Sequence, residues 1–154
     1  MLTLSAALHQ LAALVWVGGM FFAYLVLRPV LAERAAGERL AVWHGVFRRF
    51  FTWVTASIAV LFVTGYILVF GGWGGFGGVG VHVHVMHATA IVMALLFVWL
   101  IHGPWRRFEQ ARGAGDGVGA AQALGGIRRI VAANLALGLV TAVLGASGRW
   151  WGGP

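Results

Sequence analysis

The sequence predicts an all-α integral membrane protein, built as a four-helix bundle with up-down-up-down topology. Of its 154 residues, 60% are hydrophobic and only 10% are charged, whereas about 25% of a typical soluble domain is charged. Four apolar segments reach the length of about 20 residues that a membrane-spanning helix needs. The arginines fall in alternating connections between these segments, as in multi-pass proteins. We therefore expect one four-span domain over residues 1–154.

The four predicted spans cover about residues 4–27, 51–70, 83–101 and 130–146. None of them contains Asp, Glu, Lys or Arg. Proton pumps and ion-coupled transporters usually carry carboxylates inside the membrane, so their absence disfavours those classes. The chain also has no cysteine, which excludes disulfides, iron–sulfur clusters and thiol chemistry.

Arginines predict the orientation, because positive residues accumulate on the cytoplasmic side. Ten of the eleven arginines lie in the connections 28–50 and 102–129, and the connection 71–80 has none. We therefore expect two cytoplasmic loops, with both termini outside. The apolar residues of 28–50 suggest an interfacial helix, and the glycines of 102–129 suggest a mobile loop. In the glycine-rich linker 71–80, we expect Trp73 and Phe76 to lie at the lipid interface.

The start of the third span holds the densest group of potential ligands. The run 81–87 reads Val-His-Val-His-Val-Met-His. An ionisable group at the mouth of a span indicates a functional site, and imidazole is the commonest metal ligand. We expect His84 and His87 to share one helix face because they are three residues apart, and His82 to be a solvated boundary residue. Met86 would add a thioether.

His9 lies about two turns inside the first span, at a depth similar to that of the histidine run. In an up-down-up-down bundle the first and third spans are diagonal, at roughly 13 Å for neighbouring axes 8–10 Å apart. That distance suits two imidazoles holding haem between them. The sequence thus predicts a b-type haem with His9 as one axial ligand. The other ligand is His87, by depth, or His84.

The first span also has a face of small and large apolar residues, made of Ala12, Ala13, Trp16, Gly19, Met20 and Ala23 in line with His9. Trp16, Gly18 and Gly19 are candidate cofactor contacts, since glycines let a flat group approach the backbone. Ordinary helix packing is the alternative. A second, weaker metal site could involve His44 and His102, which could equally be interface residues that meet headgroups or backbone carbonyls.

Polar residues within the spans have structural interpretations. Thr52, Thr55, Ser57 and Thr64 are expected to bond to their own backbone four residues earlier. Asn134, Gly138 and Gly145 recur at helical spacing along the fourth span. We expect Asn134 to form an interhelical hydrogen bond, and this small-residue face would also suit a homodimer.

Several segments together resemble the membrane domain of CopD, the copper-resistance protein. They are residues 7–9, 14–22, 27–29, 46–51, 83–86, 104–107, 127–130 and 134–135. The resemblance implies a four-helix bacterial inner-membrane protein associated with copper handling. More distantly, the chain resembles haem-binding four-helix membrane cytochromes and the protoporphyrinogen oxidase HemJ. These resemblances imply ligand roles for His9 and, through Val83–Met86, for His84.

Three functions follow as hypotheses. In the first, bis-histidine haem b supports electron transfer or an oxidoreductase step near the periplasm. In the second, His82, His84, Met86, His87 and His9 capture a copper ion for passage across the membrane, since imidazole and thioether suit copper. Either function could involve a periplasmic redox or copper-carrying partner. In the third, the chain is a metal-free assembly subunit.

Overall fold

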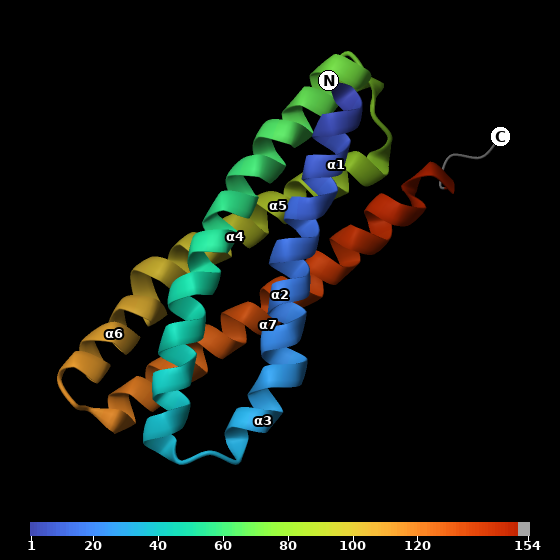
Figure 1. Cartoon of the computed structure of the whole chain (residues 1–154). Helices are drawn as coiled ribbons and strands as arrows, with labels where there is room; N and C mark the ends of the chain where they lie inside the picture. Colours follow the sequence, from blue (N-terminus) through green and yellow to red (C-terminus); the bar gives the residue numbers. More distant parts are fainter. Residues whose placement is uncertain (151–154) are drawn as a thin grey trace.

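The structure, a computed structural model, describes residues 1–150, except for the side chain of Arg149, and is helical throughout apart from short turns (Figure 1). The first helix comprises α1 (Leu2–Ala13), α2 (Gly19–Phe21) and α3 (Arg28–Ala32), joined by wider π-helical turns. The second is α4 (Ala36–Gly72). The third comprises α5 (Val81–Leu100) and α6 (Arg106–Gly113), and the fourth is α7 (Gly117–Ser147). All four are long and apolar enough to cross a membrane.

Two of the π-helical turns lie beside prolines. Pro29 follows the turn Phe22–Leu27, and Pro104 lies inside the turn Ile101–Trp105. Proline has no N–H for the helical ladder and its ring clashes with the preceding turn. A locally wider turn absorbs this misfit, so both long helices continue without a break.

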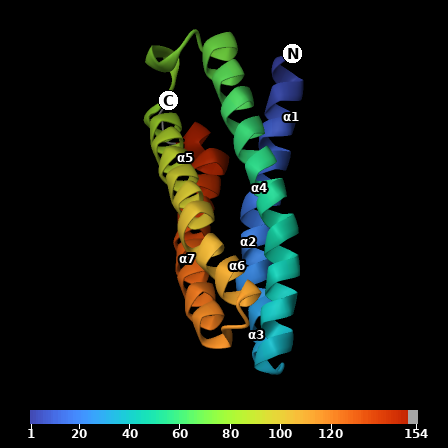
Figure 2. The ribbon, with the colours of Figure 1, turned by 90° about the vertical axis from the view of Figure 1, so that its left-hand side faces the viewer.

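Each end of the bundle has a distinct set of connections (Figure 2). The terminal end, as we name it, carries the N-terminus, the linker 73–80 and the end of α7. The turn end carries the tight reversals 33–35 and 114–116. At the second reversal Gly115 adopts a left-handed φ of 72°, which glycine accepts without strain. Asp116 then caps α7 by accepting a 2.8 Å hydrogen bond from the Gly119 N–H.

The segments 28–50 and 102–129, which we expected to be loops, are largely helical. The four helices have 31, 37, 33 and 31 residues, or about 46–56 Å at 1.5 Å per residue, longer than the roughly 30 Å hydrocarbon core. The apolar residues of 28–50 do not form a separate interfacial helix. Most of them continue α4 and pack against α6 and α7. Trp43, Phe47 and Phe108 are almost fully buried as a result.

The helices pack as two hairpins that meet along α7. The most extensive contacts join α1 to α4 and α5 to α7, and α7 also touches α2 and α4. The first helix does not pack extensively on α5, which agrees with a diagonal placement of the first and third spans. Rings from α4 reach the third helix at several levels, including Phe51 against Phe97 at 5.7 Å.

The small-residue face of α7 lies inside the bundle. Asn134 donates a 3.2 Å hydrogen bond to the Met93 carbonyl, which confirms the predicted interhelical bond. A Cβ added at Gly138 would lie 2.8 Å from Val17 Cγ2 and 3.1 Å from Met93 Cε. Much of the face that could have suited a homodimer is therefore occupied by the chain's own helices.

Candidate functional site

The histidine run forms the first two turns of α5, at the terminal end, and divides between two faces. His84 and His87 face Phe76 of the linker, with ring centroids 5.9 and 5.1 Å away. His82 and Met86 face the end of α7 instead, because their side chains fill the space above Gly148 and Gly145. The predicted shared face of His84 and His87 is present. His82, however, is a half-buried helical residue and not a solvated loop residue.

Aromatic rings from α4 surround the His87 side of this run. Phe62 and Tyr66 lie 6.2 and 5.5 Å from the His87 ring, centroid to centroid. Phe76 packs on Tyr66 and on Phe70 at 6.3 and 5.9 Å. Phe76 therefore turns inward and closes the gap between α4 and α5, whereas Trp73 is exposed as expected for an interfacial residue. Gly74 and Gly75, both at positive φ, permit the reversal that directs Phe76 inward.

The imidazoles of the run are open to ligands. Within residues 1–150, none of His82, His84 and His87 has a hydrogen-bond partner. They provide imidazole nitrogens beside the Met86 thioether, and His84 is exposed. The run therefore presents two pairs of potential ligands on adjacent helical turns, His84 with His87 and His82 with Met86.

His9 lies on the other side of α4. Its Nδ1 is 2.9 Å from Thr64 Oγ1, and its ring packs on Gly65. The Thr64 hydroxyl donates to the Val60 carbonyl at 2.5 Å, so it can only accept from the imidazole. His9 therefore carries its proton on Nδ1 and leaves Nε2 bare. A hydrogen bond on one ring nitrogen is how proteins orient a histidine that binds a metal through the other.

The structure does not gather the predicted ligands into one site. His9 contacts the α4 face containing Thr64 and Gly65, whereas His87 contacts the face containing Phe62 and Tyr66. Among residues 1–150 there is no group of three or more His, Cys, Asp or Glu side chains arranged to hold a metal ion. Any site at this end is therefore built mainly from α5.

The proposed contacts of a flat cofactor have other roles. Trp16 is buried in the core cluster. A Cβ at Gly19 would collide with the Phe50 ring, and a Cβ at Gly18 would meet no atom within 4 Å. Gly19 therefore gives room to the Phe50 ring. The roles of Trp16, Gly18 and Gly19 as cofactor contacts stay predictions.

His44 and His102 have separate partners at the turn end. The His44 ring stacks on Trp105 at 5.6 Å, and its Nε2 lies 3.9 Å from a Glu109 carboxylate oxygen. His102 is exposed, and its Nδ1 donates to the Val98 carbonyl at 2.9 Å. His102 therefore has one of the interface roles that we considered for these two residues, a hydrogen bond to a backbone carbonyl.

Comparison with known proteins adds the family. The sequence profile described as "CopD: Copper resistance protein D" matches residues 44–147. The chain belongs to the CopD family. The match includes the histidine run and three of the four helices, but it does not extend to His9. No similar curated protein and no similar solved structure was found.

Membership of the CopD family and the four apolar helices make the chain a multi-pass protein of the inner membrane. The family also relates it to copper. Sequence reasoning singled out the candidate ligands on α5, but it missed the aromatic cluster beside them, formed by Phe62, Tyr66, Phe70 and Phe76. The spacing of Phe62, Tyr66 and Phe70 by four residues was the available signal, since such residues share a helix face.

Proposed function

We propose that this protein handles copper at the membrane, capturing the ion at the terminal end through the first two turns of α5. The observation that carries the proposal is the histidine run itself. It lies within the CopD match, and its three imidazoles have no hydrogen-bond partners within residues 1–150. Under the positive-inside rule the terminal end faces the periplasm, so copper would be captured from that side.

The chemistry of the two ligand pairs supports copper. Imidazole binds copper in both common oxidation states, and a thioether favours copper(I). His84 and His87 lie one turn apart on the face toward Phe76, and His82 and Met86 lie one turn apart on the face toward α7. Two adjacent sites of low coordination number suit an ion that must be released as well as bound.

Haem has less support as the ligand. The partner that the haem hypothesis requires, His9, is directed at Thr64 and Gly65 of α4. Phe50 fills the space beside Gly19. A copper site built from α5 needs no ligand from the first helix, whereas a haem between the first and third spans does.

The test uses the full chain, purified in detergent and loaded with copper(I), with bound copper measured against a competing chelator. We expect stoichiometric copper in the wild type and loss of the ion held by the His84 and His87 pair in His84→Ala/His87→Ala. His102→Ala removes an exposed imidazole from the other end and is the matched control. His9→Ala should also retain copper, because α4 separates His9 from the run.

Unchanged copper in the His84→Ala/His87→Ala variant would overturn the proposed site. An absorption spectrum of the same sample separates copper from haem. A Soret band that is lost in His9→Ala, with no copper bound, would restore the haem hypothesis. A sample with neither copper nor chromophore would favour the assembly subunit.

A further inference from the structure

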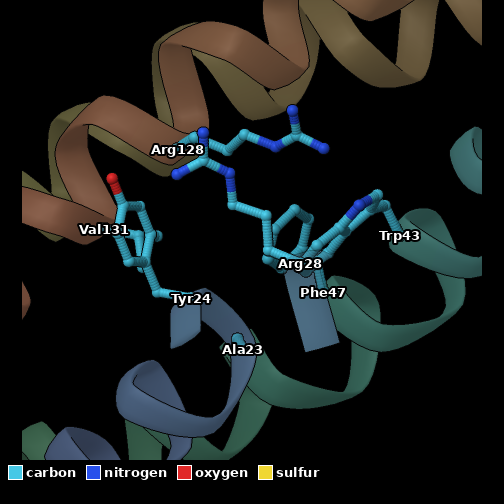
Figure 3. Close-up of a pocket in the computed structure, with 7 residues that line it drawn as sticks. All are labelled: Ala23, Tyr24, Arg28, Trp43, Phe47, Arg128 and Val131. Atoms are coloured by element: carbon cyan, nitrogen blue, oxygen red, sulfur yellow. The ribbon is translucent and has the colours of Figure 1, made fainter. Parts of the chain in front are cut away.

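A second candidate site lies at the turn end, where the first helix, α4 and α7 meet around a small pocket of about 10 Å³ (Figure 3). Its lining combines apolar side chains with two arginines: Ala23, Tyr24, Arg28, Trp43, Phe47, Arg128 and Val131. Arg28 is the first charged residue of the sequence, and Arg128 is separated from the fourth predicted span only by Arg129. Both guanidinium groups therefore lie where the hydrocarbon region gives way to the polar headgroups.

The positive charge of this pocket is not balanced by nearby acids. Arg28 and, after it, Arg39 are the side chains whose charges act most strongly on Arg128, and both are cations. Among the side chains that the structure describes, the one pair at salt-bridge distance is His44 with Glu109, and it includes neither arginine of the pocket. The guanidinium groups rest instead on aromatic rings, Arg28 at 4.9 Å from Tyr24 and Arg128 at 5.6 Å from Trp43. Such stacking compensates only part of the desolvation.

Buried hydrogen-bond donors without partners lie in the same lining. Trp43 is 2% exposed, and its indole Nε1 has no partner among the described residues. The buried Nε of Arg128 has none either. Both groups are donors only, and an unsatisfied buried donor in a native structure calls for a specific explanation. An acceptor with several oxygens would satisfy them and would also balance the two cations.

We propose that Arg28 and Arg128, at the rim of this pocket, bind a phosphate group that is supplied by an anionic phospholipid headgroup or by free phosphate. Guanidinium groups bind phosphate oxygens with charge-assisted, often bidentate hydrogen bonds. The pocket has room for one water-sized group, so a single phosphate oxygen would enter it and accept a hydrogen bond from the Trp43 N–H. The apolar residues Ala23, Phe47 and Val131 on the lining suit the neighbouring ester or acyl region of a lipid. This site lies at the opposite end from the histidine run and does not depend on the copper proposal.

The test measures binding of phosphatidylglycerol and phosphatidylcholine to the delipidated full chain in a neutral detergent, by native mass spectrometry. We expect the wild type to prefer phosphatidylglycerol. Arg28→Gln/Arg128→Gln should weaken that binding about tenfold or more, since each variant position loses the charge-assisted hydrogen bonds that a guanidinium group donates to phosphate. The control Arg106→Gln/Arg107→Gln removes the same charge from two exposed positions of α6 and should bind as the wild type does.

Trp43→Phe keeps an aromatic ring at this position and removes the indole N–H, so it tests the site even if the double arginine variant fails to fold. We expect roughly threefold weaker phosphatidylglycerol binding, as befits the loss of one hydrogen bond. Competition with inorganic phosphate identifies the source of the group: displacement of the lipid shows that free phosphate enters, and its failure shows that the headgroup is required. Phosphatidylglycerol binding that is equal in the two double arginine variants, and unchanged in Trp43→Phe, would overturn the proposal.

Discussion

His9 and Thr64 are joined across the first hairpin by a hydrogen bond of 2.9 Å between Nδ1 and Oγ1. The same hydroxyl donates to the carbonyl of Val60, so one threonine links a backbone carbonyl to an imidazole of another helix. The link fixes the tautomer of His9 and determines which of its nitrogens is available to a ligand.

Replacing Thr64 with valine should therefore destabilise the protein through His9. Valine has nearly the same shape but cannot accept the Nδ1–H proton, and a half-buried donor left without a partner costs about 1–3 kcal/mol. We expect a lower midpoint of thermal unfolding in detergent. Thr55→Val is the control, because the one hydrogen bond of the Thr55 hydroxyl goes to the Phe51 carbonyl of its own helix. Equal effects of the two substitutions would argue against the role of His9.

Two glycines of α7 should respond to alanine with opposite signs. A Cβ at Gly138 would press on Val17, a side chain whose β-branching leaves it few alternative rotamers. Gly138→Ala should therefore destabilise the bundle by about 1–3 kcal/mol, as overpacking does. A Cβ at Gly125 meets no atom within 4 Å, so Gly125→Ala should be neutral or stabilise the helix by up to about 1 kcal/mol. Thermal unfolding of the two variants, side by side, checks the prediction.

Two tryptophans of the third helix should also differ. Trp105 is 8% exposed and contacts the rings of His44, Phe51 and Phe108, whereas Trp99 is 61% exposed. Trp105→Ala removes a buried aromatic side chain and should cost about 3–5 kcal/mol. Trp99→Ala should change the unfolding midpoint little, because its side chain projects away from the bundle. A similar loss in both variants would mean that the turn-end core is not assembled as described.

Phe76 should influence copper without being a ligand. It is the ring that contacts both His84 and His87, so it restricts their positions. Phe76→Ala should weaken copper binding by roughly 2–10-fold, the range that corresponds to aromatic contacts of about 0.5–1.5 kcal/mol. The number of copper ions bound at saturation should not change. Phe70→Ala is the control, because Phe70 contacts Phe76 but neither histidine of the run; an equal loss of affinity there would point to a general loosening of the linker.

Much of the fold could be predicted from the sequence because the membrane simplifies the problem. A backbone in hydrocarbon must satisfy its own hydrogen bonds, so apolar segments of sufficient length become helices. Thr52, Thr55 and Thr64 bond to the carbonyl four residues earlier, as predicted. The fate of 28–50 was harder to predict. The charged residues of this segment indicated a loop. In the structure, however, Trp43 and Phe47 are buried in one cluster with residues some 60–80 positions later in the chain, including Phe108 and Ile127.

The site was predicted less completely, for a geometric reason. Depth along a span can be estimated by counting residues, and it correctly brought the histidine run and His9 to the same end of the bundle. The direction of a side chain around its helix depends on how each neighbour is rotated. The i−4 bond of Thr64 was predictable from its own helix, but its second role as the acceptor for His9 required the rotation of α1 against α4.

The linker 73–80, which we call the strap, joins the two helical hairpins of the molecule. At the turn end, the reversals 33–35 and 114–116 lie within the hairpins Leu2–Gly72 and Val81–Ser147 and not between them. The strap is therefore the covalent tether between the two halves, and its Phe76 is inserted beside the histidines of the second half. A movement of one hairpin relative to the other would displace the Phe76 ring. The spacing of the two hairpins and the geometry around His84 and His87 are therefore coupled.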